Sequence, residues 1–221
     1  MVLQAESLSG NSDWRQRLGN MDAPDCITSD AVLSSCLQTL CEGGRVSAET
    51  CLSLMRHDSL NAISSLASMI KRSRFGNNVF FNENLHVSPT NICVLACRFC
   101  AFRKGPRHSA AYALSPTDFL ARIEPHSSRI DEVHSVGGLH PDWKVDHYID
   151  IYSSIKDAYP HIHLKSLTAI EIIHISERSG LSVREALKLL SKSGLDSIPG
   201  GGAEVLVDSV RDRICHGKES S

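Results

Sequence analysis

Three cysteines in one short segment are the residues of this chain best suited to chemistry. Cys93, Cys97 and Cys100 follow one another with the spacing C-x3-C-x2-C. Three thiolates on one loop can bind three irons of a [4Fe-4S] cluster, which leaves the fourth iron without a cysteine ligand. An open metal position allows a cofactor or substrate to coordinate directly, as in catalytic zinc sites. The spacing therefore predicts an iron–sulfur cluster with one exchangeable position.

Other roles for these cysteines remain open at this point. A zinc site would need a fourth ligand, which His86 or His108 could supply. Cys97 and Cys100 alone could form a redox dithiol, although Cys93 would then have no role. Packing of all three side chains in the core is the remaining alternative. The spacing and the expected place of the loop, directly after a strand, favour the cluster.

The other five of the eight cysteines are scattered singly along the chain. Met1 to Gly10 have neither the basic region nor the apolar region of a secretory signal, so we expect a cytoplasmic protein. Disulfides are rare in that reducing compartment. We therefore expect the scattered cysteines to be small, buried apolar side chains: Cys26, Cys36, Cys41, Cys51 and Cys215.

Charge and hydropathy exclude several classes of partner. The 221 residues include 23 Lys and Arg and 25 Asp and Glu, with no run of one sign. Such a balance predicts no binding to nucleic acid or to an anionic membrane. No apolar stretch approaches the roughly 18 residues that a membrane span needs. The pattern indicates a soluble protein that has no polyanionic partner.

Residues 1–78 have the pattern of an N-terminal helical segment. Apolar side chains recur at helical spacing from Asp30 to Leu40 and from Ser59 to Arg74. A further helix is expected after Ser47, a good N-cap. Gly76 then supplies a terminator for the last helix.

Residues 79–221 alternate short apolar runs with amphipathic helices. We expect four strands, at 85–88, 132–136, 162–167 and 195–198. Ser115-Pro116 should begin one helix, and two capping boxes, Thr168–Glu171 and Ser182–Glu185, should begin two others. This order predicts an α/β fold with a parallel sheet. Four strands are half of a TIM-type (β/α) barrel, so we expect a partial barrel whose last strand has an uncovered edge.

Five motifs in this order resemble those of the radical S-adenosylmethionine superfamily, and within it the aminofutalosine synthase branch. They are His86-Val-Ser-Pro-Thr-Asn-Ile-Cys93, Cys100-Ala-Phe, Gly137-Gly-Leu-His-Pro-Asp142, Leu164-Lys-Ser-Leu-Thr-Ala-Ile-Glu171 and Gly194-Leu-Asp-Ser-Ile-Pro-Gly-Gly-Gly-Ala-Glu204. The resemblance covers about residues 79–215. Family members are longer than this chain, which would lack much of the second half of their barrel.

The resemblance implies a set of cofactor-binding residues. Cys93, Cys97 and Cys100 would ligate the [4Fe-4S] cluster, and S-adenosylmethionine would chelate the fourth iron. Other contacts to S-adenosylmethionine would come from an aromatic ring, a glycine-rich turn and a hydroxyl group: Phe99, Gly137, Gly138 and Thr168. Each of these four also has a purely structural explanation, as a core phenylalanine, a tight turn or a helix N-cap.

Three further residues have candidate roles near the site. His140 and Asp142 could act on acidic groups of the substrate or carry protons. Glu204 could contact the cofactor or cap a helix. The sequence assigns no catalytic residue.

The resemblance also implies an activity. The 5′-deoxyadenosyl radical from S-adenosylmethionine would add to 3-[(1-carboxyvinyl)oxy]benzoate and give 6-amino-6-deoxyfutalosine, a step of menaquinone biosynthesis. Flavodoxin or ferredoxin would supply the electron. Alternatives are a dehypoxanthine futalosine cyclase, a subunit of the synthase that makes the precursor of cofactor F420, or a truncated remnant that binds a cluster without turnover.

Overall fold

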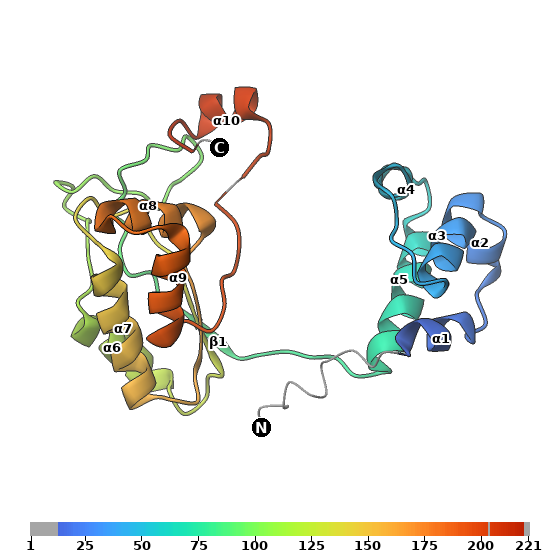
Figure 1. The fold of residues 1–221 in the computed structure, drawn as a ribbon, viewed down its shortest axis with the longest axis horizontal. Coiled ribbons are helices and arrows are strands. Elements are labelled where there is room, and N and C mark those ends of the chain that lie inside the picture. Colours follow the sequence, from blue (N-terminus) through green and yellow to red (C-terminus); the bar gives the residue numbers. More distant parts are fainter. Residues whose placement is uncertain (1–12, 203, 219–221) are drawn as a thin grey trace. The chain divides into compact units, whose positions relative to one another are not determined.

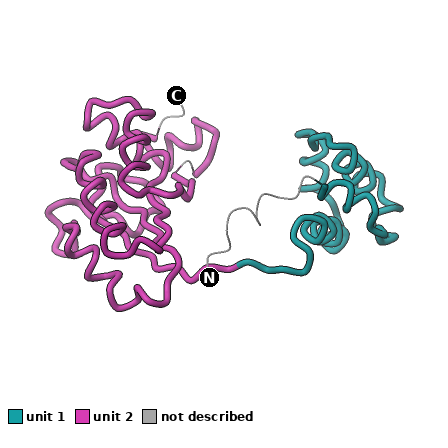
Figure 2. The backbone as a smooth tube through the Cα atoms, turned by 60° about the horizontal axis from the view of Figure 1, so that its bottom comes forward, with its two compact units in different colours: residues 1–80 teal, residues 81–221 magenta. Residues whose placement is uncertain are grey.

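The computed structural model describes residues 13–202 and 204–218 of the chain. They form two compact units that divide between Phe80 and Phe81 (Figure 2). A domain boundary at residues 78 and 79 stays a prediction. Met1 to Gly10, on which the expected lack of a secretory signal depends, lie outside the described residues, as does Ala203 of the last motif.

The first unit is helical. Its helices are α1 (Trp14–Gly19), α2 (Asp25–Thr28), α3 (Ala31–Cys41), α4 (Ala48–Met55) and α5 (Leu60–Phe75). Their common core consists of seven buried side chains: Leu18, Ile27, Leu33, Cys36, Ala62, Leu66 and Met69. The Arg17 Nε atom also donates to the carbonyl oxygen of Ser73 at 2.7 Å, which joins α1 to the end of α5.

Local signals begin and end these helices. Ser47 and Ser59 are the N-caps of α4 and α5, and each side chain accepts a backbone N–H from the first turn. Gly76 ends α5 with a φ of 60°, a conformation that favours glycine. The prediction of buried cysteines is wrong for Cys26 and Cys51, which are exposed. For Cys51 the reason is that α4 buries none of its residues.

An ion pair in this unit gives a testable pH dependence. Asp30 caps α3 by accepting the N–H groups of Val32 and Leu33, and its Oδ2 lies 2.9 Å from Nε2 of His57. The hydrogen bond to Asp30 raises the pKa of His57 above 6.5. The N–H of Leu33, followed by His57, lowers the pKa of Asp30 below 3.8. The contribution of His57 to folding is therefore fully present below about pH 6.5 and is lost as the pH rises through its raised value.

We expect the helical unit to lose stability as the pH rises above about 6.5, and His57→Gln to remove that loss. His57 is the only histidine in residues 1–80, so no other imidazole of this unit contributes. Thermal unfolding can be followed by the fluorescence of Trp14 in a Trp143→Phe background. An equal fall in midpoint in the His57→Gln protein would contradict the assignment.

The second unit contains a parallel three-stranded sheet in the order β1-β2-β3. Its strands are β1 (Asn84–His86), β2 (Glu132–Ser135) and β3 (His163–Ser166). Leu85 pairs with Val133, and Val133 pairs with Leu164. Because all three strands run the same way, their carboxyl ends lie at one edge, where ligands collect in α/β folds. The expected α/β fold with a parallel sheet is confirmed.

Helices follow each strand of this unit. They are α6 (Pro116–Ile123), the 3-10 helix η2 (Glu124–His126), α7 (Val145–Ala158), α8 (Ala169–Ser179), α9 (Val183–Lys192) and α10 (Asp208–Ile214). Helix α7 contacts α6, α8 and α9 (Figure 1). Val133 and Leu164 of the sheet share one core with Tyr152 and Ile155 of α7. Among the described residues no helix combines the length and apolar character needed to cross a membrane.

The prediction of a fourth strand at 195–198 is wrong. That segment contributes one isolated bridge, between Lys165 and Ser197. Pro199 follows directly and has no N–H group to donate to a ladder. Gly200, Gly201 and Gly202 then adopt φ values of 79°, 84° and 82°, which are incompatible with a strand. The pairing therefore stops after one residue.

Candidate cofactor site

The three cysteines lie on an irregular loop that follows the carboxyl end of β1. Hydrogen bonds from side chains of this loop hold its start in place. Thr90 is fully buried, and its Oγ1 donates to the carbonyl oxygen of Tyr112 at 2.6 Å. Asn91 donates to the carbonyl oxygen of Ala110 and accepts the N–H of Tyr112. These bonds fix the start of the loop before Cys93. The sequence motif contained both residues, but local pattern alone did not reveal their anchoring role.

The three thiols lie on this loop with different exposure. Cys93 and Cys97 are half-buried, Cys100 is exposed, and none forms a disulfide. Across residues 13–202 and 204–218, no three His, Cys, Asp or Glu side chains are arranged to hold a metal ion. The structure thus brings the cysteines onto one loop without converging their sulfur atoms into a ligand set.

The two histidines that could have completed a zinc site bind to neighbouring residues instead. His86 lies 3.1 Å from the hydroxyl of Ser88 and stacks on His134 at a centroid distance of 5.3 Å. Nδ1 of His108 accepts the N–H of Ala110. Neither imidazole joins the cysteines, so the donors of the loop are three thiols.

The glycine turn after β2 packs directly on the cysteine loop. The N–H of Gly138 donates to the carbonyl oxygen of Thr90 at 2.8 Å, and the N–H of Val94 donates to that of Leu139 at 3.0 Å. A Cβ atom added to Gly138 would overlap the carbonyl oxygen of Ile92 and lie 3.1 Å from Cβ of Cys93. The turn therefore brings backbone without side chains against the first cysteine. By their chemistry, three thiols on a loop beside such a turn are the donors that an iron–sulfur cluster open to a small ligand would need, and binding would have to bring their sulfur atoms together.

The segment around α10 covers another part of the loop. The N–H of Arg98 donates to the carbonyl oxygen of Ile214 at 2.8 Å. Burial raises the pKa of the Cys97 thiol, the charge of Lys218 opposes that rise, and the neighbouring Cys215 adds to it. Cys215 itself is fully buried, as expected for a small apolar side chain.

The structure overturns the expectation of Phe99 as a possible core residue, because its side chain is 52% exposed. The Lys218 Nζ atom lies 5.8 Å from the centroid of the Phe99 ring. The same atom pairs with Oε1 of Glu204 at 3.0 Å. Glu204 therefore forms an ion pair, and within the described part of the chain its side chain caps no helix.

Thr168 lies at the end of β3, next to the glycine-rich turn after Pro199. Its Oγ1 accepts the N–H of Glu171 at 3.3 Å, and the predicted capping box of α8 is confirmed. An added Cβ at Gly202 would lie 3.2 Å from Oγ1 of Thr168. Leu167, directly before Thr168, has a φ of 64°, which leucine rarely adopts. Such strain often marks a site where the backbone is held for function.

The ring of His140 packs against Trp143. Their centroids are 4.7 Å apart, and Trp143 stacks in turn on His147 at 3.8 Å. Burial lowers the pKa of His140. Its Nδ1 accepts the N–H of Asp142 at 3.2 Å, so the two candidate residues are joined through backbone. A neutral imidazole at this position follows from these contacts.

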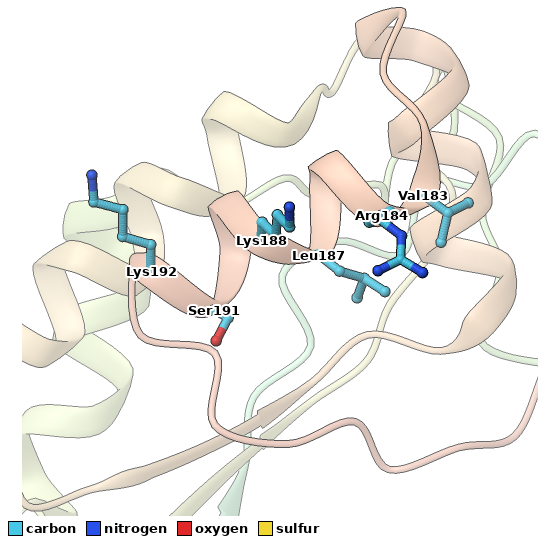
Figure 3. Close-up of a pocket in the computed structure, with 6 residues that line it drawn as sticks. All are labelled: Val183, Arg184, Leu187, Lys188, Ser191 and Lys192. Atoms are coloured by element: carbon cyan, nitrogen blue, oxygen red, sulfur yellow. The ribbon is translucent and has the colours of Figure 1, made fainter.

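A separate groove runs along α9 (Figure 3). It is lined by Val183, Arg184, Leu187, Lys188, Ser191 and Lys192. None of these residues belongs to the cysteine loop or to the turns at the strand ends. The groove therefore adds nothing to the candidate cofactor site.

Comparison with known families agrees with this geometry. Residues 87–221 match the model of the radical SAM superfamily, where SAM denotes S-adenosylmethionine. Because that match covers more than half of the chain, the protein belongs to the radical SAM superfamily. Members of this family use a [4Fe-4S] cluster and S-adenosylmethionine.

Two curated relatives with different activities are similar to this chain over most of its length. It is 34% identical over 181 residues to the aminodeoxyfutalosine synthase of Thermus thermophilus, covering 81% of this chain and 49% of the relative. It is 39% identical over 176 residues to the 5-amino-6-(D-ribitylamino)uracil--L-tyrosine 4-hydroxyphenyl transferase of Methanococcoides burtonii, covering 79% of this chain and 48% of the relative. The chain spans about half the length of these relatives, both of which are enzymes.

A solved structure is similar in fold. HydG, a maturase of the [FeFe]-hydrogenase, has a TM-score of 0.52 and 12% identity, covering 90% of this chain and 50% of that chain. At this identity the likeness concerns the fold alone. It agrees with an α/β partial barrel.

Proposed function

We propose that this chain carries the cofactor-binding half of a radical S-adenosylmethionine enzyme with aminodeoxyfutalosine synthase activity. The observation that carries the proposal is the packing of the Gly137–Gly138 turn against Ile92 and Cys93. With both cofactors bound, one-electron cleavage of S-adenosylmethionine would supply a 5′-deoxyadenosyl radical. The cytoplasm is the proposed location, and flavodoxin or ferredoxin the proposed electron donor.

The chain's own residues would divide the binding. Cys93, Cys97 and Cys100 would hold the cluster through their thiolates. The turn at Gly137 and Gly138 would receive the methionyl amino group, as the glycine-rich turn of the family implies. Both glycines contact the start of the cysteine loop. The packed turn and loop would therefore hold the methionyl amino group next to the cluster.

The nucleoside would be held by two further groups. The exposed ring of Phe99 can stack on adenine, since its face is only partly covered by the Lys218 ammonium. The hydroxyl of Thr168 lies at the end of β3 and could contact the ribose. The same hydroxyl caps α8, so its position is fixed by the helix.

The proposed substrate is 3-[(1-carboxyvinyl)oxy]benzoate. Addition of the adenosyl group, rearrangement and loss of one carboxyl group as bicarbonate would give 6-amino-6-deoxyfutalosine and methionine. His140 lies on the loop after the glycine turn, and burial lowers its pKa, so it is suited to accept a proton near neutral pH. His140 is thus a candidate proton acceptor, and we assign no catalytic residue.

Anaerobic reconstitution followed by assay tests the proposal. We expect a brown protein with about four irons per chain. Incubation with S-adenosylmethionine, a strong reductant and the benzoate should give aminodeoxyfutalosine. A stable cluster with no adenosyl product would instead indicate a remnant without turnover, and tetrahedral zinc without colour would indicate a zinc-binding protein.

A second candidate activity comes from the Methanococcoides burtonii relative, at 39% identity. It is transfer of the 4-hydroxyphenyl group of L-tyrosine to 5-amino-6-(D-ribitylamino)uracil, as that relative's name states. The same reconstituted protein should be given these two substrates in parallel. A third assay with dehypoxanthine futalosine tests the cyclase alternative. The product formed decides which reaction this half-barrel supports.

A further inference from the structure

A buried carboxylate joins the ends of β2 and β3. Glu171, in the first turn of α8, is only 2% exposed. A capping box needs its carboxylate only to accept the N–H of the N-cap residue. Oε2 does this, accepting the N–H of Thr168 at 2.7 Å. The second oxygen, Oε1, accepts the N–H of Gly137 at 2.9 Å, across 34 residues of chain.

The two N–H groups belong to two residues of the proposed cofactor site. Gly137 begins the glycine turn, and Thr168 is the proposed ribose contact. One carboxylate therefore sets the separation between them, with one oxygen for each. Both bonds have a charged acceptor, a type that is shorter and stronger than a bond between neutral groups.

The connection continues to the cysteine loop. Gly138 follows Gly137 and packs against Ile92 and Cys93. On the other side, the N–H of Leu167 donates to the carbonyl oxygen of Ser135 at 3.0 Å, which ties β3 to the end of β2. A shift of the Glu171 carboxylate would thus move the glycine turn relative to both the first cysteine and Thr168.

The carboxylate bears a desolvation cost at this place. Burial raises the pKa of Glu171, while the N–H of Gly137, the contacts of Thr168 and the charge of Lys218 oppose the rise. Tyr148 and Tyr152, both buried, lie near enough for their own pKa values to be raised in part by Glu171. A buried carboxylate with two backbone donors is held in one orientation, because losing either bond leaves a polar group unsatisfied.

We propose that Glu171 is a positioning residue for S-adenosylmethionine: its two oxygens fix the glycine turn and Thr168 at the separation that the bound cofactor requires. This inference rests on the proposed function, and it assigns a role to a residue outside the proposed cluster ligands and the proposed contacts of the cofactor. The role differs from simple helix capping because only one of the two bonds lies within the helix.

The chain offers a matched control. Glu185 occupies the same position in the capping box of α9, where its Oε2 accepts the N–H of Ser182 at 2.9 Å. Its hydrogen bonds stay within that box, to the backbone and hydroxyl of Ser182. Glu185→Gln therefore repeats the change at a cap that lies outside the candidate cofactor site.

Glu171→Gln is the decisive variant. The amide has one acceptor oxygen, so one of the two N–H groups would face an NH₂ group and lose its bond. We expect the Kd of the reconstituted protein for S-adenosylmethionine to rise about tenfold, as one such bond is lost from a preorganised site. The readout is the change that the cofactor causes in the electron paramagnetic resonance signal of the reduced cluster, at equal iron content. Glu185→Gln should bind like the unmodified protein.

The outcomes separate the two claims. Failure of the unmodified chain to bind S-adenosylmethionine would overturn the proposed function and this inference with it. Binding by Glu171→Gln with an unchanged Kd would overturn the inference alone, as would an equal loss in Glu185→Gln.

A second measurement covers the case in which Glu171→Gln does not fold. Hydrogen exchange of the unmodified, reconstituted protein should slow in two segments together on addition of S-adenosylmethionine, 136–139 and 167–171. Their amides are joined through one carboxylate, so they should respond as a pair. Slowing in one segment without the other would contradict the positioning role.

Discussion

Cys100→Ala is expected to abolish cluster binding. A cluster held by three thiolates loses a ligand, and the alanine cannot replace it, so bound iron should fall from about four per chain to below about one after reconstitution. The side chain of Cys100 is exposed, and its backbone N–H donates to the carbonyl oxygen of Cys97. Removing an exposed sulfur leaves no cavity, so the loss would report on ligation and not on unfolding.

Cys51→Ala provides the comparison. Cys51 is also an exposed free cysteine, but it lies on α4 in the helical unit. Iron content and visible absorption of that variant should equal those of the unmodified protein. If Cys100→Ala retained the full iron content and the characteristic absorption of a [4Fe-4S] cluster, Cys100 would not be a ligand, and the C-x3-C-x2-C spacing would need another explanation.

Sequence reasoning succeeded where the physical cause is local. The capping boxes Thr168–Glu171 and Ser182–Glu185 form as the spacing predicted, because hydroxyl and carboxylate reach only three residues along the chain. The helix that begins at Ser115-Pro116 also forms as predicted, because its cap is equally local. The parallel order of the first three strands also follows from the alternation of apolar runs and helices.

Sequence reasoning failed where the decisive contact joins residues that are far apart in the sequence. The second bond of Glu171, to Gly137, joins residues 34 apart, and no periodicity signals it. The buried position of Lys218 near the cysteine loop was likewise unexpected. The fourth strand was predicted from its apolar residues, although Pro199 and the positive φ values after it limit pairing to one bridge. Turn chemistry outweighed strand propensity at that edge.

Gly138→Ala is expected to disrupt the second unit more than any exposed substitution. The added methyl group would lie 2.7 Å from the carbonyl carbon of Ile92 and 3.1 Å from Cβ of Cys93. Most of this obstacle is backbone, which cannot rotate away as a flexible side chain can. The turn must therefore separate from the loop, and we expect a loss of about 3 kcal/mol, at the upper end of the cost of overpacking. For a unit of this size that corresponds to a fall in Tm of about 10 °C.

The fluorescence of Trp143 in a Trp14→Phe background can follow unfolding of this unit, and the cluster signal can follow cofactor binding in the same samples. Gly105→Ala is the matched control, because an added Cβ there meets nothing within 4 Å and the substitution lies on the same irregular segment after β1. That control should unfold and bind S-adenosylmethionine like the unmodified protein. Gly138→Ala should lose both stability and cofactor binding. The added methyl group would collide with Ile92 and Cys93, and the same contact would hold the first cysteine beside the glycine turn. Equal behaviour of the two variants would show that the turn and the cysteine loop are not in contact.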